Sequence, residues 1–105
     1  MVVRIWHGIT SKENAAAYEQ LVTSKIFKDI EAKTGDGFEG VQLLKREMPE
    51  EVEFTTMIWF RDMETIKKFV GEDYETAYVP VEAKKLLLRY DPTVTHSRLI
   101  YSSES

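Results

Sequence analysis

Cysteine is absent from this 105-residue chain, so disulfide bonds, a thiolate nucleophile and cysteine-bound zinc are all excluded. Long hydrophobic runs are also missing, since no apolar stretch approaches the about 20 residues that a membrane-spanning helix needs. The first residues, MVVRIWHG, have the pattern of a strand and lack the hydrophobic segment of a secretory signal. We therefore expect a cytoplasmic protein that does not associate with a membrane.

An excess of positive charge is missing as well. The formal net charge is −4, and the lysine and arginine residues are scattered without a basic stripe. Nucleic acid binding depends on such a stripe, so no nucleic acid partner is expected. The chain also lacks linkers, repeats and low-complexity segments. Its 43% apolar content is that of an ordinary globular protein, which predicts one domain over residues 1–105, with 102–105 as a frayed tail.

Hydrophobic periodicity predicts four strands and three helices. The strands cover residues 2–9, 38–47, 52–60 and 93–101, and the helices cover 12–34, 63–70 and 82–87, with a further helical turn at 73–79. Thr10 and Glu13 have the spacing of a capping box for the first helix, and Asp62 is the expected N-cap of the second. Gly35 and Gly71 are expected to end these two helices.

This order of elements predicts an α+β protein with the ferredoxin-like βαββαβ fold, an antiparallel four-stranded sheet with helices on one face. Residues 48–51 join the two middle strands as a hairpin. Within the sheet we expect strand 2–9 to lie beside strand 52–60 and parallel to it. Strand 93–101 should lie on the other side of strand 2–9 and run antiparallel to it.

One face of such a sheet has no helices to cover it. We expect Val3, Ile5 and His7 to face the helices, which places Trp6 with Met57 and Trp59 on the open face. A large aromatic side chain left in water forgoes roughly 2 kcal/mol of burial free energy. The sequence therefore predicts a homodimer that packs sheet against sheet through these three residues. The alternative is that one tryptophan packs under a loop of its own chain.

Six segments of the chain carry a family resemblance. They are residues 3–8 (VRIWHG), 13–18 (ENAAAY), 40–47 (GVQLLKRE), 51–54 (EVEF), 69–75 (FVGEDYE) and 90–96 (YDPTVTH). These segments are spread over nearly the whole chain, and they resemble the antibiotic-biosynthesis-monooxygenase-like family of dimeric α+β barrels. The resemblance is stronger to an uncharacterised branch of that family than to its enzymes with known substrates, so it implies the fold better than the chemistry.

The resemblance implies a ligand cleft between the sheet and the helices of each subunit. Characterised members oxidise planar aromatic polyketides with O₂ and no added cofactor, so no cofactor is expected here. A related branch binds and degrades haem with an asparagine, a tryptophan and an axial histidine. His7, Phe69 and Tyr78 occupy those places in this chain. Haem degradation is therefore not expected, although a tyrosine can ligate haem iron.

His7 is the first catalytic candidate. An imidazole, with an unperturbed pKa of about 6.5, can take a proton at neutral pH, and a deprotonated phenolic substrate is electron-rich enough to reduce O₂. His96 is the second candidate, because the start of its strand should meet the end of the strand that carries His7. The pair could be a relay, a base with its orienting partner, or a weak metal site. No metal is expected, since no third histidine or cysteine exists. A structural histidine bonded to a backbone carbonyl is the alternative for His7.

Aromatic side chains in the second half of the chain are candidates for lining the ligand cleft. These ligand-binding candidates are Phe54, Phe69, Tyr74, Tyr78 and Tyr90, with Arg89 as a partner for an anionic group. Ordinary core packing is the alternative for Phe54 and Phe69, and a solvated surface charge is the alternative for Arg89.

Three functions remain open from the sequence. The first is a cofactor-independent monooxygenase that acts on a small aromatic compound, such as a polyketide or quinol. The second is a dimeric protein that binds a small ligand in the same cleft without turning it over. The third is a related isomerase or decarboxylase in which His7 moves a proton.

Overall fold

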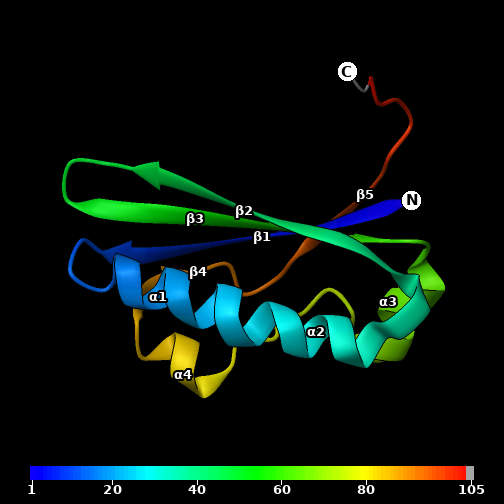
Figure 1. The fold of residues 1–105 in the computed structure, drawn as a ribbon, viewed down its shortest axis with the longest axis horizontal. Helices are drawn as coiled ribbons and strands as arrows, with labels where there is room; N and C mark the ends of the chain where they lie inside the picture. The colour runs from blue at the N-terminus through cyan, green and yellow to red at the C-terminus, as the bar shows by residue number, and fades with distance from the viewer. Residues whose placement is uncertain (104–105) are drawn as a thin grey trace.

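The computed structural model describes residues 1–103, which form one sheet with all the helices on one of its faces (Figure 1). The strands are β1 (Val2–Ser11), β2 (Phe38–Glu47), β3 (Glu51–Phe60), β4 (Leu87–Tyr90) and β5 (Thr95–Arg98). The helical segments are α1 (Ala15–Leu21), the π-helix η1 (Val22–Ile26), α2 (Phe27–Thr34), the 3₁₀ turn η2 (Gly35–Gly37), α3 (Met63–Val70) and α4 (Val81–Lys84). None of the helices within residues 1–103 is long and apolar enough to cross a membrane.

The sheet order is β2-β3-β1-β4, with β5 also paired to β1, and every pairing is antiparallel. The predicted α+β ferredoxin-like fold is confirmed. The predicted parallel pairing of the first and third strands is wrong, because β1 and β3 run antiparallel. The β2–β3 hairpin reverses the chain, so β3 lies between β1 and β2 and antiparallel to both, while β1 and β2 share one direction.

The edge strand beside β1 has two pieces: β5 lies within the strand predicted over 93–101 but is shorter, and β4 was not predicted as a strand. Its two pieces pair with the two halves of β1: β4 with Gly8–Thr10, and β5 with Val2–Ile5. Asp91 and Pro92 lie at the break, where proline has no N–H to donate to a ladder. The helical turn predicted at 73–79 is irregular chain, and the helix predicted over 82–87 is the shorter α4.

Several local predictions are confirmed. Asp62 caps α3, since its Oδ1 accepts hydrogen bonds from the backbone N–H and the hydroxyl of Thr65, both at 2.9 Å. Gly35 and Gly71 end their helices at φ of 58° and 88°, where a residue with a Cβ is strained. The capping box at Thr10 is wrong, because Thr10 is a fully buried residue of β1 and the helix begins after Asn14.

The two faces of β1 are opposite to the prediction. Arg4 and Trp6 face the helices, and His7 faces the open side of the sheet. Register fixes this assignment, because Trp6 lies opposite the buried Thr56, and His7 lies opposite Thr55. The prediction failed because the more apolar side of β1 was assigned to the core, and in this protein that side is the open one.

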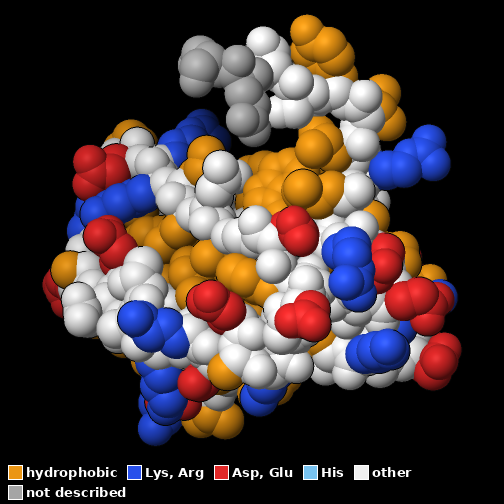
Figure 2. Space-filling view, turned by 45° about the vertical axis from the view of Figure 1, so that its right-hand side comes forward, with side chains coloured by type: hydrophobic (Ala, Val, Ile, Leu, Met, Phe, Trp, Pro, Cys, Tyr) orange, Lys and Arg blue, Asp and Glu red, His pale blue; other side chains and the backbone are white. Residues whose placement is uncertain are grey.

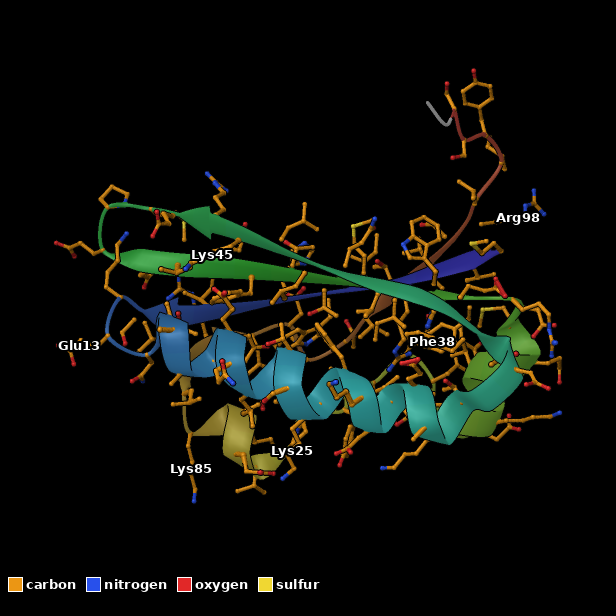
Figure 3. The ribbon with its side chains drawn as sticks, in the orientation of Figure 1. Glu13, Lys25, Phe38, Lys45, Lys85 and Arg98 are labelled. Atoms are coloured by element: carbon orange, nitrogen blue, oxygen red, sulfur yellow. The ribbon has the colours of Figure 1, made fainter. Side chains whose placement is uncertain are left out.

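Side chains on both faces of the sheet are apolar. On the helical side the fully buried residues include Val52, Phe54, Phe60 and Ile66. Figure 3 shows further side chains projecting from the upper face, over which no helix lies. The open face carries Ile5, Ile9, Met57 and Trp59, all half-buried, and Val3, which is buried. Figure 2 shows hydrophobic side chains at the surface beside the C-terminal tail and again in the middle of the molecule.

Candidate functional site

An apolar cavity lies between the sheet and the helices and opens to solvent. Its volume is about 80 Å³. The sheet contributes Arg4, Trp6, Thr56 and Ile58; the helices contribute Tyr18, Val22, Ile26, Phe27, Ile30, Phe69 and Ala83; and the chain around Ala77, Tyr78, Val79, Pro80 and Val94 completes the lining. Such a lining, mostly apolar with a few polar groups, is typical of small-molecule sites.

A π-helical turn shapes the helical wall of this cavity. The segment η1 interrupts the first long helix, and its first and last residues, Val22 and Ile26, both line the cavity. The hydroxyls of Thr23 and Ser24 donate to the carbonyls of Glu19 and Gln20 at 2.7 and 2.6 Å, which are carbonyls of the preceding turn. π-Turns inside α-helices are frequent at functional sites.

Arg4 is the one permanently charged group in the cavity lining of the described chain, and it is only 6% exposed. Its Nη1 donates to the carbonyl oxygen of Tyr74 at 2.6 Å and to Nε2 of His96 at 2.9 Å. Its Nη2 donates a longer bond to the carbonyl oxygen of Thr76 at 3.4 Å. Burial lowers the pKa of Arg4 to about 10, so the guanidinium remains protonated at neutral pH.

His96 is held neutral by its surroundings. Arginine has no acceptor atom, so Nε2 of His96 must be the unprotonated nitrogen in its contact with Arg4. Burial and the positive charge of Arg4 lower the pKa of His96, and the negative charge of Glu75 partly opposes them. The ring of Tyr74 packs against the imidazole with centroids 5.7 Å apart. The catalytic role predicted for His96 stays a prediction, while its contact with Arg4 is a structural finding.

Tyr18 places a phenol in the same cavity. The residue is 2% exposed and its ring packs on Phe54 with centroids 4.9 Å apart. Burial raises the pKa of this phenol, so Tyr18 stays protonated at neutral pH and can serve as a hydrogen-bond donor to a ligand.

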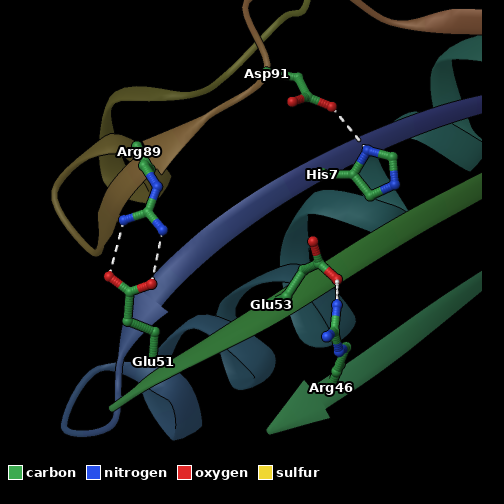
Figure 4. Close-up of polar contacts among 6 residues, drawn as sticks. All are labelled: His7, Arg46, Glu51, Glu53, Arg89 and Asp91. Carbon is green, nitrogen blue, oxygen red and sulfur yellow. Dashed lines mark hydrogen bonds and ion pairs between the residues drawn. The ribbon is translucent and has the colours of Figure 1, made fainter. Parts of the chain in front are cut away.

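His7 lies outside the cavity, on the open face of the sheet. Its Nδ1 is 2.8 Å from Oδ2 of Asp91, and both side chains are about half exposed (Figure 4). The backbone carbonyl of Asp91 accepts a hydrogen bond from the indole N–H of Trp6 at 2.8 Å, which fixes that ring in the cavity wall. His7 and His96 lie on opposite faces of the sheet, because His96 pairs with Arg4 in the β1–β5 ladder. The two histidines therefore do not share one site.

The structure separates the predicted ligand-binding residues. Phe69 and Tyr78 line the cavity. Phe54 is fully buried in the core, and Tyr90 packs beside Trp6 with ring centroids 6.0 Å apart. Of the predicted interface residues, Met57 and Trp59 face the open side, whereas Trp6 faces the helices.

Arg89 is not among the residues that line the cavity, and it forms two hydrogen bonds to Glu51, at 2.7 and 2.8 Å (Figure 4). These bonds lower the pKa of Glu51 and raise that of Arg89. This surface ion pair links Arg89 of β4 to Glu51 of β3. The carboxylate of Glu51 is therefore already the partner of the Arg89 guanidinium.

The cavity is small for an aromatic ligand. A volume of about 150 Å³ holds a benzene ring in a protein interior, and this cavity has about half of that. Tyr78, which is 67% exposed, lines this cavity and two neighbouring hollows, as does Phe69. Binding of a larger ring would require lining side chains such as these to move.

Arg4, Tyr18 and Thr56 line the cavity but were not predicted as site residues from the sequence. The sequence did contain a signal for Arg4. Arg4 is two residues before Trp6 and so shares its side of the strand, and the rest of that side is apolar. Among residues 1–103 no three histidine, aspartate or glutamate side chains converge as a metal-binding group.

Comparisons with known proteins establish the fold. No protein-family model matches the sequence, and no curated protein matches it either. A Bacillus cereus protein that carries the provisional name of antibiotic biosynthesis monooxygenase has a similar structure, with a TM-score of 0.61, 12% identity and 97% of each chain covered. The Rv0793 protein of Mycobacterium tuberculosis matches with a TM-score of 0.61, 16% identity and 98% of each chain covered. The family resemblance seen in the sequence is thereby confirmed at the level of the fold.

Proposed function

We propose that this protein is a monooxygenase that acts on a small aromatic compound in the cavity between the sheet and the helices, with no added cofactor. The observation that carries the proposal is the cavity itself, an apolar hollow whose lining includes Trp6, Phe27 and Phe69 together with the buried cation of Arg4. The Bacillus cereus protein with the same fold bears the name of such an enzyme, which supports the reaction class.

The reaction would convert a methylene group of an anthrone-like substrate to a carbonyl. In balanced form, R₂CH₂ and O₂ give R₂C=O and H₂O: one oxygen atom enters the substrate, and the other leaves as water. The substrate first loses a proton, and the resulting carbanion then transfers electrons to O₂. An apolar lining supports this step, because a substrate that fills the cavity displaces water from around the reactive intermediate.

A non-catalytic ligand-binding function is the alternative, and one observation favours it. Within the described chain the cavity lining contains no carboxylate and no imidazole, the side chains that most often serve as a general base. The proposed oxygenation therefore requires either a substrate that arrives ionised or a base outside the lining. His7 stays a predicted base, but its ring lies on the other face of the sheet.

We further propose that the protein is a homodimer formed through the open face of the sheet. Ile5, Met57 and Trp59 form an apolar surface there that no element of the described chain covers. The tail beyond β5 projects on the same side, and its Ile100 and Tyr101 are 84% and 80% exposed (Figure 1). A second copy packed on this face would bury these side chains together.

Oxygen uptake with quinol and anthrone substrates tests the enzymatic proposal. The variant Ala77→Phe places a ring in the cavity and should abolish uptake, while Ala16→Phe adds the same ring to an exposed position of α1 and should leave it unchanged. If calorimetry detects ligand binding but no oxygen is taken up, the enzymatic proposal is wrong and the ligand-binding alternative holds. Equal activity in the two variants would place the reaction outside this cavity.

A further inference from the structure

Arg4 has a charge that no carboxylate of the described chain balances. Its hydrogen-bond partners are two backbone carbonyls and the neutral imidazole of His96. The ion pairs found within residues 1–103 join other arginines, two lysines and His7 to aspartate or glutamate, and none of them involves Arg4. A buried arginine ordinarily has an acidic partner, because an unbalanced charge is costly away from water. The structure therefore contains a cation that lacks its anion.

Part of the guanidinium remains available for a ligand. It has five N–H groups, and the three contacts to Tyr74, His96 and Thr76 use three of them. Arg4 lines the cavity together with the hydroxyls of Tyr18 and Thr56, but within the described chain its hydrogen bonds go to Tyr74, His96 and Thr76 and not to these hydroxyls. An oxyanion in the cavity is thus the group that would complete the hydrogen bonding of Arg4.

The choice of a histidine as partner is consistent with this arrangement. His96 orients the guanidinium through Nε2 as a carboxylate would, but it adds no negative charge. The positive charge of Arg4 is therefore not neutralised by His96 and can interact with a ligand in the cavity. Charge-assisted hydrogen bonds from a guanidinium as buried as that of Arg4 to an anion are strong.

We propose that the cavity selects an aromatic oxyanion, a ring that bears one carboxylate or phenolate oxygen bound by Arg4. This inference rests on the proposed function, since it names the substrate class of the same cavity. The apolar lining binds the ring, and the guanidinium binds the ionised oxygen. For a phenol, the consequence is that binding favours the phenolate and releases one proton to solvent, so that no basic side chain in the cavity is needed.

Calorimetry with benzoate and its neutral analogue benzamide tests the selection, because the two have nearly the same shape. Benzoate should bind about tenfold or more tightly than benzamide to the unmodified protein. Arg4→Met should remove this preference, and Arg46→Met, which neutralises an exposed arginine of β2, should retain it. Circular dichroism of each variant checks that it is folded. If Arg4 only tethers the chain at Tyr74, benzoate and benzamide would lose affinity equally, which would overturn the inference.

A spectroscopic measurement on the unmodified protein gives an independent result. 4-Nitrophenol, titrated with protein below its own pKa, should develop the absorbance of the phenolate as it binds. Binding without this absorbance would overturn the oxyanion selection and leave the cavity as a ligand site. Binding of neither benzoate, benzamide nor 4-nitrophenol would overturn the proposed function together with the inference.

Discussion

At the scale of single residues, the contact between Arg4 and His96 determines the character of the cavity. The two residues are 92 positions apart in the chain, and β1 and β5 bring them opposite each other in the sheet. The contact requires His96 to be neutral, because an imidazolium would place a second positive charge 2.9 Å from the guanidinium. Protonation of this one histidine would therefore remove one of the three contacts that orient Arg4.

This contact predicts a pH dependence of stability. The pKa of His96 is lowered in the folded protein, so just below pH about 6.5 the unfolded chain binds more protons than the folded one. The contribution of His96 to the free energy of unfolding is complete above the pKa of the unfolded chain. It is lost as the pH falls from that value toward the lower pKa of the folded protein. Urea unfolding at a series of pH values should show this loss in the natural protein.

The variant His96→Gln keeps an acceptor for Arg4 but does not titrate, so its loss of stability below pH about 6.5 should be smaller. His7→Gln is the matched control, because His7 lies on the other face of the sheet, and it should retain the loss seen in the natural protein. An unchanged profile in His96→Gln would contradict the assignment.

At the scale of elements, short-range signals fix where the helices begin and end. Asp62, Gly35 and Gly71 occupy the predicted positions, because an N-cap and a left-handed C-terminal residue act within one turn. Thr10 and Glu13 had a similar local signal, but β1 extends to Ser11 and buries Thr10. Pairing with β3 along the whole strand outweighed the capping preference.

The cap of α3 can be tested directly. Asp62→Ala removes the acceptor for both groups of Thr65 and should lower the melting temperature by about 4–8 °C. Asp62→Asn retains an oxygen at the same position and should lose much less. Thermal unfolding followed by circular dichroism measures both, and equal melting temperatures for the two variants would show that the cap is not what stabilises the start of α3.

At the scale of the whole molecule, a single layer of helices covers one face of the sheet and leaves the other face open. The fold places the cavity on the covered side and an apolar surface with Met57 and Trp59 on the other. The same β1 strand serves both sides, with Arg4 and Trp6 toward the cavity and Ile5 toward the open face. The dimer proposal follows because the apolar side chains on the open face have no helix to cover them.

Sedimentation at micromolar concentration should give a mass twice that of the 12.2 kDa chain. Trp59→Glu places a charge on the open face and should shift the protein to the monomer mass. Val81→Glu makes the same change at an exposed position of α4, on the helical side, and should leave the mass unchanged. A natural protein that sediments only as a monomer would contradict the dimer.

The sequence by itself determined the fold class, the β2–β3 hairpin, the start of α3 and the glycines that end α2 and α3, because periodicity, caps and turns act between near neighbours in the chain. Only the tertiary structure decided which side of β1 faces the helices. Alternation defines two sides of a strand but not which is buried when both bear large apolar residues. Arg4, Tyr74 and His96 meet across 70 to 92 residues, and such contacts depend on the register of the sheet, which no local pattern encodes.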